Sequence, residues 1–123
     1  MAEHNELGDL AEKIASSYLE NKNYEIVALN KKDKLSEIDI IALEKNELVF
    51  VEVRARKTEK YGGPEESVDN RKLKKIVFNA HKYMSEENYQ GLARIDVVCL
   101  VFNDFEEVER FSHYENVYWG DQD

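Results

Sequence analysis

Two carboxylates and one arginine, Asp39, Glu52 and Arg54, lie among apolar residues, where uncompensated like charges are costly. A divalent cation would relieve that cost. Mg²⁺ and Mn²⁺ prefer hard oxygen ligands. Such ligands could come from the two carboxylates, from a backbone carbonyl such as that of Val53 and from several waters. Because such a cation can polarise a phosphate and activate a water for in-line attack, these residue types indicate a hydrolytic metal site.

The three residues belong to a predicted β-hairpin. Residues 38–43 and 48–53 are rich in the β-branched and apolar side chains that favour strands, and only four residues separate them. If the two middle residues of this connection form the centre of the turn, counting back along both arms places Asp39 opposite Glu52. Opposed side chains share a face about 5 Å apart, and the arginine two positions after Glu52 points to that face. The hairpin therefore predicts one polar cluster.

A second interpretation of the hairpin needs no metal. Antiparallel strands commonly alternate apolar residues that face the core with polar residues that face water. Asp39 and Glu52 would then lie on a solvated face, with Arg54 as an ion-pair partner. The hairpin alone does not distinguish these interpretations.

A helix predicted over residues 9–20 adds a third carboxylate. Five apolar or aromatic residues recur there at helical spacing, and Glu12 borders their face, where it could reach the edge of a sheet underneath. A structural role is the alternative, because Asp9 as N-cap with Glu12 three residues later resembles a capping box. The five residues of the apolar face are Ala11, Ile14, Ala15, Tyr18 and Leu19.

The remaining pattern predicts an α/β fold in one domain over residues 1–123. We expect a mixed central sheet of four or five strands flanked by helices. The strand over residues 93–102 is nearly continuous in apolar residues, which indicates an internal position in the sheet. In chain order, the elements besides the hairpin and first helix are a strand (24–29), a polar loop (30–34), a short helical turn (64–67), a helix (70–84), a strand (93–102) and an edge strand within the aromatic tail (103–119).

Charge is distributed unevenly along the chain. The formal net charge of −9 disfavours a polyanionic partner for the molecule as a whole. Between Arg54 and Lys82, however, nine Lys or Arg oppose four Asp or Glu, a local charge of +5, so the rest carries −14. This basic centre fits a localised phosphate-binding face, and a solvated helix surface is the alternative. The residues expected to contact nucleic acid are Arg56, Lys57, Arg71, Lys72, Lys74 and Lys75.

Composition excludes several other kinds of site. The single cysteine, Cys99, excludes an internal disulfide and a cysteine-based metal cluster, and its apolar neighbours predict that it is buried. His4, His81 and His113 have no metal-ligand spacing. No apolar run is long enough for a signal peptide or a membrane span, so we expect a cytoplasmic protein without a membrane partner or a small-molecule cofactor.

Residue identities at fixed spacings extend over most of the chain, from about Gly8 to Val98. They include Gly8-x-x-Ala11-Glu12, Glu37-Ile38-Asp39-Ile40-Ile41-Ala42, Phe50-Val51-Glu52-Val53-Arg54-x-Arg56, Tyr61-Gly62-x-Pro64-x-Glu66-x-Val68 and Arg94-x-Asp96-Val97-Val98. In these positions the chain resembles the YraN-like family of small bacterial proteins. That family is assigned to the PD-(D/E)xK nuclease superfamily and is similar in core to archaeal Holliday-junction resolvases, so the resemblance implies a restriction-endonuclease-like fold.

The resemblance also implies a role for each charged residue. Asp39 and Glu52 would be metal ligands, and Glu12 would bind the metal directly or through water. Arg54 stands where a lysine that orients or activates the attacking water is usual. Because arginine stays protonated, Arg54 could stabilise developing negative charge but could not act as a general base. The implied catalytic residues are Glu12, Asp39, Glu52 and Arg54.

Three functional hypotheses follow. The first is a Mg²⁺- or Mn²⁺-dependent endonuclease that hydrolyses phosphodiester bonds in DNA, including branched or otherwise structured DNA. The second is a non-catalytic nucleic-acid-binding or scaffold protein that retains the nuclease fold, which the protonated Arg54 and the acidic surface favour. The third is a protein-binding domain that uses the acidic, aromatic C-terminal region. The sequence leaves open whether a homodimer supplies a second site for paired cuts.

Overall fold

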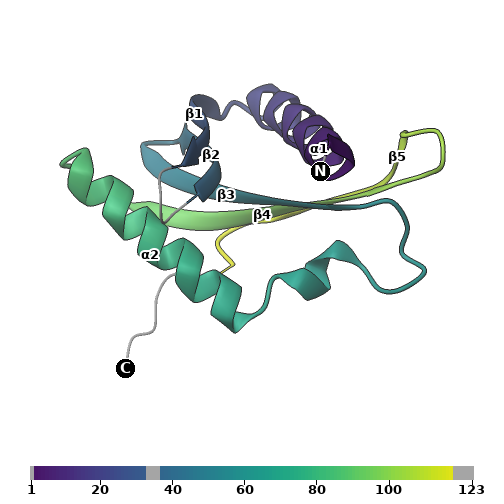
Figure 1. The fold of residues 1–123 in the computed structure, drawn as a ribbon. Coiled ribbons are helices and arrows are strands. Elements are labelled where there is room, and N and C mark those ends of the chain that lie inside the picture. Colours follow the sequence, from purple (N-terminus) through teal and green to yellow (C-terminus); the bar gives the residue numbers. More distant parts are fainter. Residues whose placement is uncertain (1, 33–36, 118–123) are drawn as a thin grey trace.

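The computed structural model describes residues 2–32 and 37–117, in which one sheet lies between two helices (Figure 1). Within these ranges, no helix is long and apolar enough to cross a membrane. In chain order the elements are α1 (Ala2–Asn21), β1 (Glu25–Lys32), β2 (Glu37–Glu44), β3 (Glu47–Arg56), the 3₁₀ turn η1 (Pro64–Ser67), α2 (Asn70–Glu86), β4 (Ala93–Phe102) and β5 (Val108–Tyr114).

The five strands form one mixed sheet in the order β1-β2-β3-β4-β5. β3 and β4 run parallel, and the other neighbouring pairs are antiparallel. Since parallel neighbours need a long crossover, the chain between them includes α2. The predicted mixed sheet flanked by helices is confirmed, as are the short turn at 64–67 and the internal position of residues 93–102.

The inner strands are buried on both faces, because α1 covers one face and α2 the other (Figure 1). On the first face, Leu19 of α1 belongs to the same apolar cluster as Val49 of β3. On the second face, Ile76 of α2 packs in a cluster with Phe50, the next residue of β3. Neighbouring strand residues point to opposite faces, so a strand between two helices is apolar throughout. Cys99 of β4 is fully buried, as predicted.

The predicted hairpin register is confirmed from the turn as far as Ile40 and Val51. The turn residues Lys45 and Asn46 have φ angles of 53° and 66°, and left-handed values at both positions are typical of a type I′ turn. Pairing between β2 and β3 ends at Ile40 and Val51, so the predicted pairing of Asp39 with Glu52, the next two residues, is wrong. β3 continues beside β4 as far as Arg56. The last part of β3 therefore has an open edge on the side of β2.

The first helix is longer than predicted. It begins at Ala2 rather than at residue 9, because Leu7 and Leu10 extend the apolar face that packs on the sheet. Asp9 therefore lies inside the helix and not at its N-cap. The capping-box interpretation of Asp9 and Glu12 is wrong.

The ends of two other predicted segments also differ. β1 continues to Lys32 because residues 31 and 32 pair with the start of β2, so the loop predicted from residue 30 is wrong for its first three positions. The rest of that loop, from residue 33, lies outside the described residues. An edge strand in the tail is confirmed as β5, while Tyr118 and Trp119 lie outside the described residues.

Candidate metal centre and basic cleft

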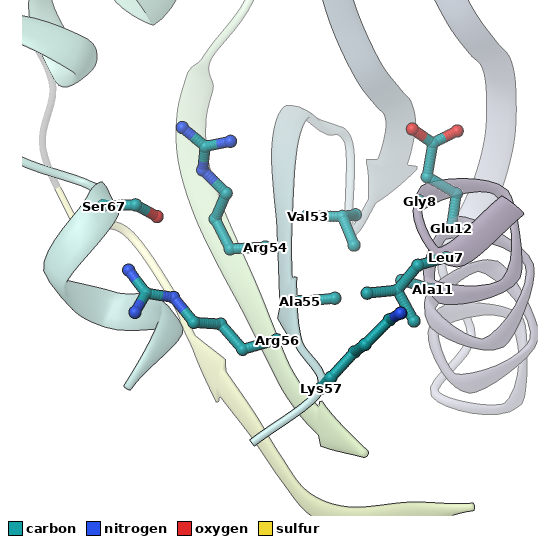
Figure 2. Close-up of a pocket in the computed structure, with 10 residues that line it drawn as sticks. All are labelled: Leu7, Gly8, Ala11, Glu12, Val53, Arg54, Ala55, Arg56, Lys57 and Ser67. Carbon is teal, nitrogen blue, oxygen red and sulfur yellow. The ribbon is translucent and has the colours of Figure 1, made fainter. Parts of the chain in front are cut away.

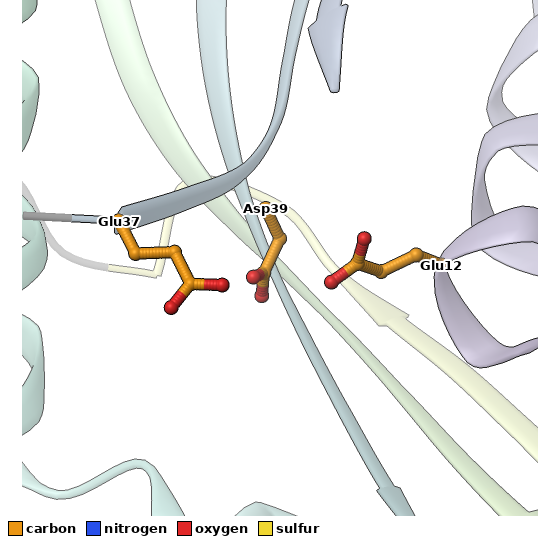
Figure 3. A group of neighbouring side chains, drawn as sticks. All are labelled: Glu12, Glu37 and Asp39. Atoms are coloured by element: carbon orange, nitrogen blue, oxygen red, sulfur yellow. The ribbon is translucent and has the colours of Figure 1, made fainter. Parts of the chain in front are cut away.

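Three carboxylates from two elements converge near the open edge of β3 (Figure 3). Glu12 comes from α1, whereas Glu37 and Asp39 come from β2, and one oxygen of each lies within 4.8 Å of the others. Alternation along the strand places Glu37 and Asp39 on the same side of β2. We call these three residues the carboxylate group.

Asp39 is oriented by the backbone of the neighbouring strand. The Val53 N–H donates a hydrogen bond of 2.8 Å to Asp39 Oδ2, in the region where β2 and β3 no longer pair. A side chain therefore satisfies a strand N–H that a ladder bond would otherwise satisfy. In an extended residue the N–H and C=O point to the same side of the strand, so the Val53 carbonyl also faces this open edge.

Glu52 lies beside the carboxylate group and is held by two cations. The residue is 6% exposed, and its Oε2 lies 3.3 Å from Arg54 Nε and 3.6 Å from Lys72 Nζ. Arg54 belongs to the same strand, while Lys72 comes from the first turn of α2. The predicted proximity of Glu52 and Arg54 is thus present, and the second cation comes from a separate element.

Burial makes three of the carboxyl groups, those of Glu12, Asp39 and Glu52, more difficult to ionise. Desolvation, followed by repulsion from Asp39, raises the pKa of Glu12 to about 7 and that of Glu52 to about 7. Desolvation also raises the pKa of Asp39, although the hydrogen bond from Val53 opposes this shift. Near neutral pH, protons therefore compete with any cation for the same oxygens.

The donors fit a hard divalent cation. Fully ionised, the carboxylate group and Glu52 carry four negative charges, and the two cations beside Glu52 supply two positive charges. The remaining charge of −2 matches one Mg²⁺ or Mn²⁺. Every side-chain donor is a carboxylate oxygen, which suits these ions better than Zn²⁺ or Cu²⁺.

A cleft of about 420 Å³ adjoins this centre between α1 and the end of β3 (Figure 2). Glu12 contributes to the α1 side of the cleft, whereas Arg54, Arg56 and Lys57 line it from β3 and the residue that follows. Ser67 of η1 also belongs to the lining. Figure 2 shows the Lys57 side chain pointing towards α1, whereas those of Arg54 and Arg56 point towards η1 and away from Glu12. An anionic ligand at the end of β3 would thus meet positive charge from both sides of the strand.

An arginine from β5 fixes the segment between β3 and α2. Arg110 lies 2.8 Å from Glu59 and 2.7 Å from Glu65, and the Tyr114 hydroxyl donates a hydrogen bond of 2.8 Å to Glu65. Hydrogen bonds from Arg110, with that from Tyr114, lower the pKa of Glu65 to about 2. These contacts join η1 and the loop before it to β5, and so position Ser67 at the cleft.

The residues predicted to contact nucleic acid occupy three different places. Arg56 and Lys57 line the cleft. Lys72 lies 3.6 Å from Glu52, and thus beside the candidate metal centre, although its side chain is 33% exposed. The other three residues are exposed in the first turns of α2, and they are Arg71, Lys74 and Lys75.

The sequence-based prediction does not place two residues, Glu37 and Lys72, in this candidate centre. Glu37 is absent from the predicted ligand set, although its spacing of two from Asp39 predicts a shared side of a strand. Lys72 is predicted only as a phosphate contact. No local pattern indicates its contact with Glu52, because that contact depends on how α2 packs against the sheet.

Comparison with known proteins identifies the family. The model described as "Uncharacterised protein family UPF0102" matches residues 11–100. A UPF0102 protein of Caldanaerobacter subterraneus is 40% identical over 114 residues, which cover 91% of this chain and 93% of that protein. A UPF0102 protein of a Sulfurihydrogenibium species is 41% identical over 112 residues, which cover 90% of this chain and 92% of that protein. The chain therefore belongs to the UPF0102 family, as its YraN-like resemblance predicts.

Proposed function

We propose that this protein is a divalent-metal-dependent endonuclease of the PD-(D/E)xK superfamily that hydrolyses phosphodiester bonds in DNA. The observation that carries the proposal is the convergence of Glu12, Glu37 and Asp39 beside a cleft lined by Arg54 and Arg56. Phosphodiester hydrolysis needs a cation near the scissile phosphate and positive charge for its oxygens. The carboxylate group supplies ligands for the cation, and the arginines supply positive charge for the phosphate oxygens.

The residues divide these tasks between them. The carboxylate group, with Glu52 beside it, would hold the cation, and the hydrogen bond from Val53 keeps the Asp39 carboxylate at the open edge of the sheet. Bound Mg²⁺ or Mn²⁺ would supply Lewis-acid activation of the phosphate and of the attacking water. Arg54 stays protonated, so it stabilises negative charge on the phosphate and accepts no proton. Arg56 and Lys57 grip the DNA backbone without reading its sequence.

The position of the cleft favours a substrate held on one face. Positive charge is concentrated between residues 54 and 82, and the rest of the chain is acidic. Long duplex contacts around the molecule would meet repulsion, whereas a short contact at the cleft would not. This restriction and the resemblance to junction resolvases support branched or otherwise structured DNA as the substrate.

Cleavage assays on linear, forked and four-way-junction DNA with Mg²⁺ or Mn²⁺ test the proposal. We expect the wild type to cut at least one of these substrates, EDTA to stop the reaction, and Asp39→Ala to abolish cleavage while it preserves DNA binding. An Asp39→Ala protein that still cuts would contradict the assignment. Salt-sensitive DNA binding without cleavage, unchanged by EDTA, would instead support the non-catalytic DNA-binding function that protonated Arg54 favours.

A further inference from the structure

Lys72 reaches a buried carboxylate from the partly exposed start of a helix. Its side chain is 33% exposed, while that of its partner Glu52 is 7% exposed. The Lys72 N–H donates a hydrogen bond of 2.9 Å to Oδ1 of Asp69, the N-cap of α2, so its backbone position is fixed. The four-carbon side chain is the flexible part, and its ammonium is the charge that can move.

Arg54 and Lys72 differ in how easily each can leave Glu52. Arg54 lies two residues along the same strand, and its Nε is buried without a hydrogen-bond partner in the described structure. Lys72 contacts Glu52 from another element. Its side chain is 33% exposed and that of Arg54 is 32% exposed, so overall exposure does not separate the two cations, whereas the burial of Arg54 Nε does. A divalent cation on Glu52 would repel both positive charges, because like charges a few ångströms apart interact strongly at a partly buried site. The Lys72 ammonium can therefore move away from Glu52 more easily than the Arg54 guanidinium can.

We infer that Lys72 is the counter-ion of Glu52 in the metal-free protein, that a divalent cation displaces it, and that the released ammonium binds a phosphate of the substrate. This inference rests on the proposed function. Lys72 lies in the first turn of α2, where Arg71, Lys74 and Lys75 also concentrate positive charge. Metal occupancy thereby adds one cation to the phosphate-binding face, so the metal binds first and strengthens the later interaction with DNA.

Metal affinity gives the first test. If Lys72 competes with the metal, its removal should raise Mn²⁺ affinity, whereas a substitution that disturbs the structure of the site should lower it. Mn²⁺ binding is measured by electron paramagnetic resonance of the free ion for wild type, Lys72→Met and Lys72→Arg. We expect Lys72→Met to bind Mn²⁺ about tenfold more tightly, since it lacks the competing charge. Lys72→Arg keeps the charge and should bind like the wild type. Lys74→Met is the matched control, because it removes an exposed charge from the same helix turn.

DNA affinity as a function of salt gives the second test. With Ca²⁺ as an oxygen-preferring cation, the slope of log K against log salt should be shallower by about one for Lys72→Met than for the wild type. In EDTA the two slopes should agree, because Lys72 is then engaged by Glu52. A purely structural role for Lys72 would not produce a difference that depends on the metal.

The outcomes separate this inference from the function on which it rests. Mn²⁺ binding by the wild type with equal affinity in Lys72→Met overturns the inference and leaves the metal site intact. Failure of the wild type and all variants to bind Mn²⁺ overturns both. Circular dichroism confirms that each variant is folded, and Lys72→Gln replaces Lys72→Met if the latter is not.

Discussion

At the scale of single residues, the candidate metal centre combines carboxylates that range from buried (Glu52) to exposed (Glu37) with cations that only partly compensate their charge. Glu52 has two cationic neighbours, whereas the carboxylate group has the Val53 N–H as a hydrogen-bond donor to Asp39. Such an arrangement destabilises the folded protein where burial removes hydration from an ionised carboxylate without supplying a full partner, as at Glu52. The centre should therefore show its function through changes in stability as well as through activity.

The first prediction concerns Glu52 and pH. Because burial raises its pKa from the ordinary 4.5 to about 7, the folded protein holds this proton more tightly than the unfolded chain does. Its contribution to stability is thus largest below about pH 4.5 and is lost as pH rises towards 7. In EDTA at pH 8, Glu52→Gln should be more stable than the wild type by about 1 to 2 kcal/mol.

Urea unfolding at pH 5 and pH 8 measures this difference. The advantage of Glu52→Gln should shrink towards pH 5, and saturating Mn²⁺ should reverse it, because a ligand that binds only the folded state stabilises it. Equal stability of the two proteins at pH 8 in EDTA would contradict the conclusion that the ionised Glu52 carboxylate destabilises the folded protein.

The second prediction concerns Glu37 as a ligand. Replacing it by Gln removes a charged oxygen from the carboxylate group while preserving size, so Mn²⁺ affinity should fall about 10- to 100-fold. Isothermal titration calorimetry measures the decrease, with the exposed loop residue Glu106 replaced by Gln as the control. A Glu37→Gln protein with wild-type affinity would exclude Glu37 from the ligand set.

At the scale of elements, a second polar network holds the end of the sheet that lies under the C-terminal part of α1. Asp96 is fully buried and accepts hydrogen bonds from Arg94 Nε at 3.0 Å and from the Tyr24 hydroxyl at 3.1 Å. His113 Nε2 of β5 lies 2.8 Å from the same carboxylate, and Arg94 also pairs with Glu47 at 2.8 Å. This network joins the residue before β1 to β3, β4 and β5, and so supports the sheet that carries the carboxylate group.

The third prediction is that Asp96→Asn destabilises the folded protein. Although burial opposes the shift, hydrogen bonds from His113 and Arg94 lower the pKa of Asp96, so its stabilisation is present above the ordinary carboxyl range and is lost as pH falls. Leaving Arg94 without this partner should cost about 3 kcal/mol at pH 7. Urea unfolding measures the cost, and the exposed Asp104→Asn should change stability by less than about 0.5 kcal/mol.

The fourth prediction concerns the segment that Arg110 holds against β5. Arg110→Met removes the ion pairs to Glu59 and Glu65, so amide hydrogen exchange should accelerate in residues 57–67 and remain unchanged in the core of β4. The neighbouring Glu109→Gln, which changes an exposed side chain, is the control. Unchanged exchange across residues 57–67 would show that other contacts position η1.

At the scale of the whole molecule, the fold was more predictable than the site. The hairpin register follows from four connecting residues and the alternation beside them, and the continuous apolar run of β4 indicates an internal strand. The start of α1 was less predictable because Leu7 is followed by Gly8 and Asp9 and the residues before it are mostly polar. Lys72 could not be placed from the sequence, since its contact with Glu52 joins two elements through tertiary packing.

The fifth prediction follows from the charge distribution. Replacing Arg71, Lys74 and Lys75 by Gln should lower the salt slope of DNA binding by about one for each phosphate that the variant no longer binds, with little effect on Mn²⁺ affinity. Fluorescence anisotropy over a range of salt concentrations measures the slope, and Lys13→Gln on α1 provides a control far from α2 in sequence. A triple variant with the wild-type slope would place the DNA elsewhere.

The most direct test of the metal centre is Mn²⁺-induced broadening of amide signals in NMR spectra of the wild type and of Asp39→Asn. We expect strong broadening around Glu12, Glu37, Asp39 and Val53 in the wild type, and its disappearance in the variant, because these residues meet at one edge of β3. Broadening spread over the acidic surface, and equal in both proteins, would contradict a built metal site and with it the proposed nuclease.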